Sequence, residues 1–499
     1  MSTLSNDHTE KGVPRRNFLA GTVTLAGASL ISIPTAARAA QPPSPAAGNA
    51  AEAKNLVLVG TNDLQARSTY QPVIEFNPIA QRWIFYGGEH LGHTVNPLTG
   101  DDEPNGTSVV DVTDPKRPTY MAHIPGPGGP TSSAQMVRIA NGSDLPKGDP
   151  KKVYLLRACG GSDPQQNAHE IWDVTDPGKP EKVTTIVSGL TDTHKSWWEA
   201  ETGIAYLVSG VPGWRVTRMT QVYDLSDPTH PRFVRNFGLD GQQPGSTGPV
   251  PTEVHGMISV PSVNRVYFGY GTADNGYMQI IDRQKLLTGG ADPTPANLDF
   301  PQVSLHKMSS LNGDHTTFPV LGMTAPEFTA WPDGGKRDIV AITGEEEGNQ
   351  ATAGHPQMLW FADITDETTP QIVSNYHVDE RSGGFASRGG RFGSHATNEN
   401  MTSIYYRKVV FVSYFVAGVR AVDMRDPYSP KEAGYYIPAI TDNTTPSCIT
   451  VNGQQQCKRA IQTNNVEVDD RGYVYIVDRA GTGLHVLRPT GDLANIVGL

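Results

Sequence analysis

One short pattern recurs along most of the chain and constrains its fold more than any other feature. An apolar run ends in Asp and is followed by a hydrophobic residue, Ser or Thr, Asp-Pro and a second Pro, as in residues 108–118. β-Branched residues favour a strand, Asp and Ser/Thr side chains bond the turn backbone, and Pro ends the strand. Further copies end their runs at Asp173, Asp224, Asp363 and Asp423, a degenerate copy ends at Asp282, and the last copy, at residues 484–487, has lost the Asp.

Each copy of this pattern lies between other strand-like segments. Two precede it, such as residues 255–260 and 265–270, and one follows it, such as residues 232–234. Four antiparallel strands in a repeating unit are typical of a propeller blade. The units begin near Gln71, Ser132, His194, His255, His315, His395 and Asn464. We therefore predict an all-β fold, a seven-bladed β-propeller with four antiparallel strands per blade over residues 55–499, in which residues 55–60 add the outer strand of the last blade.

The Asp, Ser/Thr, Asp-Pro and second Pro element resembles the repeat of the LVIVD family of β-propellers, and the likeness extends over nearly all of the chain after residue 54. The resemblance implies a fold and not an activity.

The first 54 residues have a different character. Arg15-Arg16-Asn17-Phe18-Leu19 opens an apolar run, and Ala37-Arg38-Ala39 offers a small-residue cleavage site. This segment resembles a twin-arginine (Tat) export signal, although Pro14 replaces the usual Ser or Thr; an ordinary secretory signal or a membrane anchor is the alternative. We expect a signal peptide over residues 1–39, a linker over residues 40–54, and a periplasmic or secreted protein without a membrane span.

The net charge and the cysteines bear on the partners of the protein and on its covalent structure. The formal net charge of −11 argues against a nucleic-acid partner. Cys448 and Cys457 are separated by a segment that contains the turn signal Asn-Gly, and an exported protein favours a disulfide between them.

Four histidines occupy the same position in consecutive units. In three of the units the histidine (His194, His255 or His395) lies about 30 residues before the Asp that ends the third strand. For His315 this spacing is longer, because residues 322–336 form an insertion. In a propeller the first strand of each blade lines the central channel. The repeat therefore predicts that four imidazoles converge on the channel axis.

Imidazole is a common ligand for Fe, Cu, Zn and Ni, whereas Mg²⁺ and Ca²⁺ prefer oxygen. We predict that His194, His255, His315 and His395 bind a transition metal, with Fe(II) or Cu favoured and Zn also compatible. The arrangement is similar to that of the carotenoid cleavage oxygenases, seven-bladed propellers with four axial histidines on iron, although their sequence motifs are absent. The corresponding positions near Gln71, Ser132 and Asn464 hold polar neutral residues, so we expect the site to be open on that side.

Candidate catalytic side chains lie in loops predicted on the same face. They are Glu345, Glu346, His90 and His93. Carboxylates that could fix the histidine tautomers are also near in sequence, namely Asp192, Glu199, Glu253 and Asp314.

Three functions fit these features. The first is an exported metalloenzyme, an oxidoreductase or oxygenase acting on a small organic substrate in the channel mouth. The second is a metal-dependent hydrolase or lactonase. A serine hydrolase is disfavoured, because the chain has no Gly-x-Ser-x-Gly motif. The third is a binding propeller without catalysis, which requires neither a metal nor the four histidines.

Overall fold

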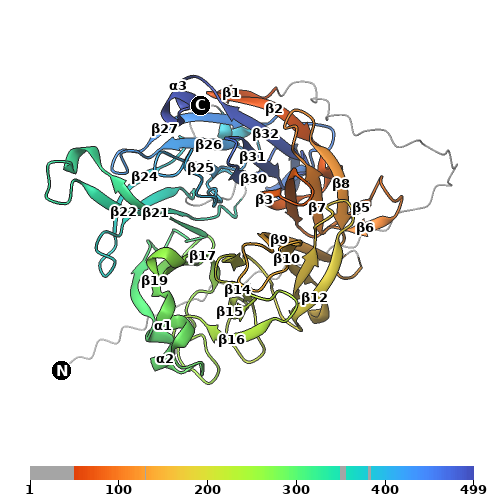
Figure 1. The fold of residues 1–499 in the computed structure, drawn as a ribbon. Coiled ribbons are helices and arrows are strands. Elements are labelled where there is room, and N and C mark those ends of the chain that lie inside the picture. The colour runs from red at the N-terminus through yellow and green to blue at the C-terminus, as the bar shows by residue number, and fades with distance from the viewer. Residues whose placement is uncertain (1–49, 130, 349–355, 380–383) are drawn as a thin grey trace, which may run out of the picture. The chain divides into compact units, whose positions relative to one another are not determined.

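The computed structural model describes residues 50–129, 131–348, 356–379 and 384–499. All of the described residues belong to one compact unit. The predicted signal peptide and most of the predicted linker therefore lie outside the described residues. The described unit is all-β and consists mainly of four-stranded antiparallel sheets (Figure 1).

The first two sets of four strands follow the chain order. They meet through the single residue pair Glu89 and Ala134. The first set contains β3 (Thr69–Asn77), β4 (Arg82–Glu89), β7 (Thr107–Asp111) and β8 (Thr119–Ile124). The second contains β9 (Ser132–Asn141), β10 (Val153–Gly161), β11 (Ala168–Asp173) and β12 (Glu181–Ser188).

The next three sheets repeat this arrangement. The third contains β13 (Trp197–Trp198), β14 (Ile204–Ser209), β15 (Met219–Asp224) and β16 (Arg232–Phe237). The fourth contains β17 (Val254–Val260), β18 (Arg265–Tyr270), β19 (Tyr277–Asp282) and β20 (Gln302–Lys307). The fifth contains β21 (Thr316–Thr324), β22 (Lys336–Thr343), β23 (Leu359–Asp363) and β24 (Gln371–Tyr376), so the predicted insertion lies at the β21–β22 connection.

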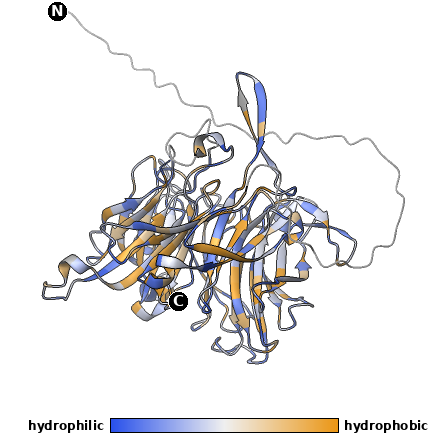
Figure 2. Cartoon of the chain, turned by 90° about the horizontal axis from the view of Figure 1, so that it is seen from above, coloured by the Kyte–Doolittle hydropathy of each residue, from blue (hydrophilic) through white to orange (hydrophobic). Residues whose placement is uncertain are grey.

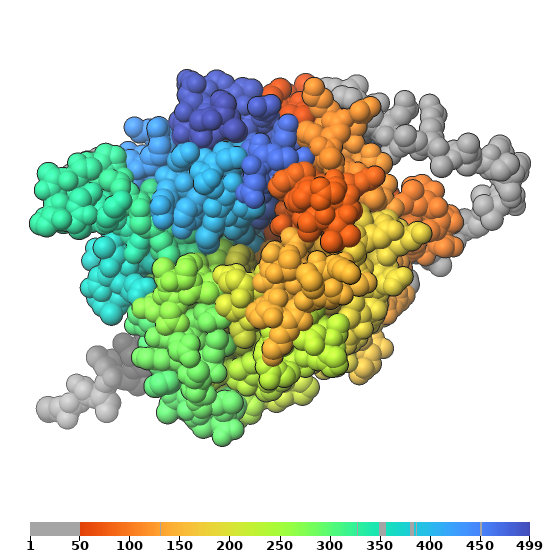
Figure 3. Space-filling view, viewed as in Figure 1, coloured from red at the N-terminus to blue at the C-terminus, as the bar shows by residue number. Residues whose placement is uncertain are grey.

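The last two sheets each take a strand from the beginning of the described chain. The sixth contains β25 (Val409–Ser413), β26 (Val419–Asp423), β27 (Lys431–Ile437) and β1 (Glu52–Lys54). The seventh contains β30 (Thr463–Val468), β31 (Val474–Asp478), β32 (Leu484–Pro489) and β2 (Leu56–Asn62). The pairing of β2 with β32 confirms the strand exchange predicted for residues 55–60, and β1 lies within the segment predicted as linker. The second strand, β2, and the last strand, β32, consequently lie side by side (Figures 1 and 3).

Side-chain hydrogen bonds explain why the repeated motif forms a turn. The backbone N–H of Thr113 donates to Asp111 (2.9 Å), and the Thr113 hydroxyl accepts from the N–H of Trp83 at the start of the adjoining strand (3.0 Å). The second Asp of the motif, Asp114, accepts from Lys116 N–H (3.1 Å). The same bonds to the first Asp recur at Asp173, Asp224, Asp363 and Asp423. In the degenerate copy Asp282 instead caps a helix.

Apolar side chains are concentrated on the sheet strands (Figure 2). Six buried clusters each join two sheets that are consecutive in the chain, or join the seventh sheet to the first. A further cluster contains Ile258, Phe318 and Val410 and so joins the fourth, fifth and sixth sheets. The joint between the first and seventh sheets contains Ile74, Phe85, Tyr475 and Val486.

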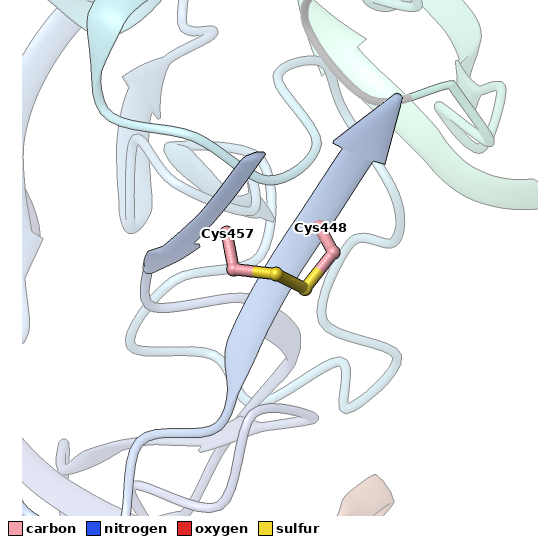
Figure 4. The surroundings of a disulfide bond; sticks show 2 residues. All are labelled: Cys448 and Cys457. Atoms are coloured by element: carbon pink, nitrogen blue, oxygen red, sulfur yellow. A yellow bond between two sulfur atoms is a disulfide. The ribbon is translucent and has the colours of Figure 1, made fainter. Parts of the chain in front are cut away.

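Two hairpins and eight short helices complete the described chain. The hairpins pair β5 (His93–Val95) with β6 (Asp102–Pro104) and β28 (Pro446–Val451) with β29 (Gln454–Arg459). The predicted disulfide between Cys448 and Cys457 is present in the second hairpin (Figure 4). The helices are η1 (Leu64–Ala66), η2 (Pro164–Gln166), η3 (Pro261–Val263), α1 (Arg283–Thr288), α2 (Pro295–Asp299), η4 (Pro326–Phe328), η5 (Phe385–Ser387) and α3 (Gly491–Val497). Among the described residues no helix has the length and apolar character to cross a membrane.

Candidate functional site

The four predicted histidines lie where the innermost segment of their sheet begins. The His194 N–H donates to Val208 O (2.9 Å), and His255 is the second residue of β17. The His315 N–H donates to Thr343 O (2.6 Å), and that of His395 donates to Ser413 O (3.0 Å). Each histidine is at most 6% exposed. Backbone bonds to the second strand therefore fix His194, His315 and His395, whereas His255 lies between the paired residues Val254 and Gly256.

The four imidazole rings are in contact in chain order. Ring centroids are 4.6 Å apart for His194 and His255, 3.6 Å for His255 and His315, and 4.3 Å for His315 and His395. The Nε2 atoms of His194 and His255 are 2.8 Å apart. The equivalent positions of four successive sheets thus converge on one cluster, which we call the histidine cluster.

Backbone carbonyls fix the tautomers of two of these rings. Nδ1 of His255 lies 2.8 Å from the carbonyl oxygen of His315, and Nδ1 of His395 lies 2.5 Å from that of Asn464. Because a carbonyl only accepts, each Nδ1 carries the proton and each Nε2 has a free lone pair. Nε2 of His395 is buried without a hydrogen-bond partner among the described residues. Burial lowers the pKa of all four histidines, which favours neutral imidazole, the metal-binding form.

Glu345 adds a carboxylate to the histidine cluster. Its Oε2 lies 3.8 Å from His315 Nε2, and its Oε1 lies 3.7 Å from His395 Nε2. Burial alone would raise the pKa of Glu345, but the neighbouring His395 and the guanidinium groups of Arg479 (3.3 Å) and Arg391 (2.7 Å) at Oε1 hold that pKa well below its usual value. One ligand atom from each of His255, His315 and Glu345 lies within 4.8 Å of the others, the only such group of three among the described residues.

Tyr70 of β3 is a member of the cluster that was not predicted. Its hydroxyl lies 3.4 Å from His194 Nε2 and 3.3 Å from His315 Nε2, and its ring centroid is 5.6 Å from that of His395. It therefore occupies part of the side that we expected to be open. The available signal was its position, because Tyr70 immediately precedes Gln71, the predicted start of the first unit.

The remaining predicted catalytic residues lie at the edge of the cluster or away from it. His90 is at the edge, with its ring 5.2 Å from that of Tyr70 and its Nε2 2.9 Å from Arg479 Nη2. Glu346 instead accepts from the backbone N–H groups of Gly348 and Gln357. His93 is exposed on the β5–β6 hairpin, where it pairs with Asp102 (3.1 Å).

The carboxylates expected to orient the imidazoles have other partners. Asp192 pairs with Arg218, Glu199 pairs with Arg283, and Glu253 accepts from Thr217. The oxygens of buried Asp314 have no hydrogen-bond partner among the described residues. Carbonyl groups fill the expected role at His255 and His395. Successive side chains along a strand point to opposite faces, so Asp314 is directed away from the ring of His315.

Comparison of the chain with protein-family models and with curated proteins gives no match. The function is therefore inferred from the site.

Proposed function

We propose that the seven sets of strands form a closed seven-bladed β-propeller of the LVIVD type, exported by the Tat pathway to the periplasm or beyond. The strand β2 in the seventh sheet and the apolar cluster shared by the first and seventh sheets support closure. The twin arginines Arg15 and Arg16 support export. Replacing both with Lys should abolish export of a tagged full-length chain, and unchanged export would refute the Tat assignment.

We further propose that the histidine cluster binds a transition metal on the propeller axis. The observation that carries this proposal is the convergence of four buried neutral imidazoles beside one ionised carboxylate. His194, His255, His315 and His395 would hold the ion, and Glu345 is a fifth candidate ligand.

The spacing and chemistry of these groups suit such an ion. Two nitrogens that each lie about 2.1 Å from one metal at a right angle are about 3.0 Å apart, close to the 2.8 Å between the His194 and His255 Nε2 atoms. The free Nε2 of buried His395 is a further donor without a partner. Four nitrogens and one carboxylate suit Fe(II) or Cu, and also Zn, better than Mg²⁺ or Ca²⁺.

The activity that these residues favour is oxidation or oxygenation of a small organic substrate. A metal held by four neutral imidazoles would supply redox and Lewis-acid chemistry. Tyr70 can donate a hydrogen bond at the centre of the cluster, and Arg391 and Arg479 keep Glu345 ionised and in place. The burial of the imidazoles excludes bulk water.

Metal analysis tests the proposal directly. Purified protein should contain Fe, Cu or Zn near one equivalent, and the double variant His255→Ala, His395→Ala should bind it at least about 100-fold more weakly, because loss of a ligand costs more than loss of a group that orients one. His93→Ala is the matched control, since His93 is an exposed histidine outside the cluster.

A folded protein that binds none of Fe, Cu, Zn, Mn or Ni would refute the metal site. For protein that binds metal, dioxygen consumption over a panel of small organic substrates should appear and should be lost in the double variant. Hydrolysis without dioxygen consumption would instead favour the hydrolase or lactonase function.

A further inference from the structure

A cavity lies at the ends of the innermost strands that are opposite to the histidine cluster. It has a volume of about 360 Å³ and is lined by residues from β3, β9, β13, β17, β30 and the segment 399–401. Glu399 and Glu467 line it, four and three residues beyond His395 and Asn464 in the same inner segments. At about 3.3 Å per residue this separation is on the order of 10 Å or more from the histidine cluster.

The wall of this cavity carries more carboxylates than cations. Glu75, Glu201, Glu399 and Glu467 line it, whereas Glu199 is neutralised by Arg283. Glu399 is paired with Arg138 (2.6 Å) and with Lys195. With Arg283 they make three cations against the five carboxylates of the wall, so the carboxylates are in excess by two.

Glu467 is the deepest of the unbalanced carboxylates. It is 5% exposed and accepts backbone N–H bonds from Glu399 (3.1 Å), Asn400 (3.0 Å) and Val468 (2.9 Å). No cationic side chain contacts it among the described residues. Burial raises the pKa of Glu467 to about 7, and burial likewise raises that of Glu75 to about 7. A cation in the cavity would therefore add to the partial stabilisation that the three backbone N–H groups give the ionised carboxylate.

The rest of the wall is apolar and aromatic. Ile139, Val260 and Met401 line it together with Trp197 and Trp198. Trp198 is 7% exposed, and its indole N–H has no acceptor among the described residues. Because that N–H is itself shielded, it is not available to a ligand in the cavity, and the tryptophans offer a ligand only aromatic surface.

We propose that this cavity binds a small organic cation, an ammonium compound with an apolar part. The carboxylates of Glu467 and Glu75 receive the ammonium group, and the apolar and aromatic wall contacts the carbon skeleton. Aromatic rings also attract ammonium groups.

The geometry favours an organic cation over a metal ion. Among the described residues, only the histidine cluster brings ligand atoms of three His, Cys, Asp or Glu side chains within 4.8 Å of one another. The side chains of this cavity do not. The volume also exceeds what a single ion needs, and pockets of this size with apolar walls are typical of small molecules.

Tryptophan fluorescence provides the experiment, because Trp197 and Trp198 line the cavity. Full-length mature protein is titrated with choline, with ethanolamine, and with 3,3-dimethylbutan-1-ol, the neutral isostere of choline. At least one of the two cations should bind at least 10-fold more tightly than the isostere. Equal affinity for all three would overturn the proposal, as would a response to Ca²⁺ that exceeds the response to both amines.

Two variants locate the binding. Glu467→Gln and Glu75→Gln should each weaken binding of the cation at least 10-fold and leave the affinity for the isostere unchanged. Glu181 is an exposed carboxylate of β12, and Glu181→Gln should change neither affinity. Two independent variants guard against misfolding of one of them. Unchanged affinity in both folded variants would overturn the assignment.

The metal-site double variant His255→Ala, His395→Ala should bind the cation as the unmodified protein does. The two sites can thus succeed or fail separately.

Discussion

The buried side chains of His255, His395 and Glu467 are held mainly by the backbone. The carbonyl groups of His315 and Asn464 fix the imidazoles of His255 and His395, and three backbone N–H groups surround the carboxylate of Glu467. Backbone groups at strand positions move little, so these side chains are oriented before any ligand binds.

The carboxyl of Glu467 should make stability depend on pH. Its pKa rises on folding from 4.5 to about 7 because it is buried. Between these values the folded state binds more protons than the unfolded state, so the contribution of this group to the free energy of unfolding is fully present below pH 4.5 and is lost as pH rises through 7. The loss is about 3 kcal/mol at most.

Glu467→Gln removes this titration. Denaturant unfolding measures the free energy of unfolding of the unmodified protein and of Glu467→Gln. The value for the unmodified protein minus that for the variant should fall as the pH is raised from 5 to 8. A difference that stays constant or rises would contradict the assignment of this carboxyl as buried and unpaired, and Glu181→Gln again serves as the exposed control.

At the scale of the element, the contact between β2 and the first repeat turn leaves no room for a side chain. Gly60 of β2 lies against the backbone of Pro115 and Lys116, so an added Cβ would overlap the Pro115 carbonyl oxygen. The obstacle is backbone, which cannot rotate aside as a side chain does.

Gly60→Ala should therefore destabilise the protein by about 1–3 kcal/mol, the usual cost of overpacking. Denaturant unfolding measures the change. Gly129→Ala is the matched control, because a Cβ at Gly129 has no atom within 4 Å, and it should change stability by less than about 0.5 kcal/mol. Equal stability of both variants would show that β2 does not pack against this turn.

At the scale of the whole molecule, the chain ends are joined by sheet pairing. β1 pairs with β27 and β2 pairs with β32, so one short segment covers the outer edges of the sixth and seventh sheets. Uncovered sheet edges promote aggregation, and this segment protects two of them.

A chain that begins after residue 62 should lose both edge strands. We expect it to unfold at a temperature at least about 10 °C lower than the chain that begins at residue 40, or to aggregate, because the backbone groups of β27 and β32 lose their partners. Scanning calorimetry and light scattering measure these outcomes. Equal melting temperatures would show that β1 and β2 contribute nothing to stability.

The repeat made much of the fold and part of the site predictable. The Asp and Ser/Thr residues of each motif form local turns, so their effect does not depend on distant contacts. His194, His255, His315 and His395 were found because each occupies the same position in consecutive repeats, and equivalent positions of adjacent sheets are brought to one place.

Other parts of the site had no such signal. Tyr70 is of a different residue type from the histidines, and a carbonyl group that orients an imidazole is present at every residue. His93 and Glu346 are near the site in sequence, but the β5–β6 hairpin and the loop after β22 direct them elsewhere.

The sequence by itself determined an all-β chain of repeated four-stranded units, a strand returned from the start of the chain to the last sheet, and four histidines in equivalent positions. These properties follow from short-range patterns that each repeat carries within itself. Only the tertiary structure decided which side chains share a site, because the contact of Tyr70 with His315 and the grouping of Glu75 with Glu467 depend on how distant segments pack and what that packing buries.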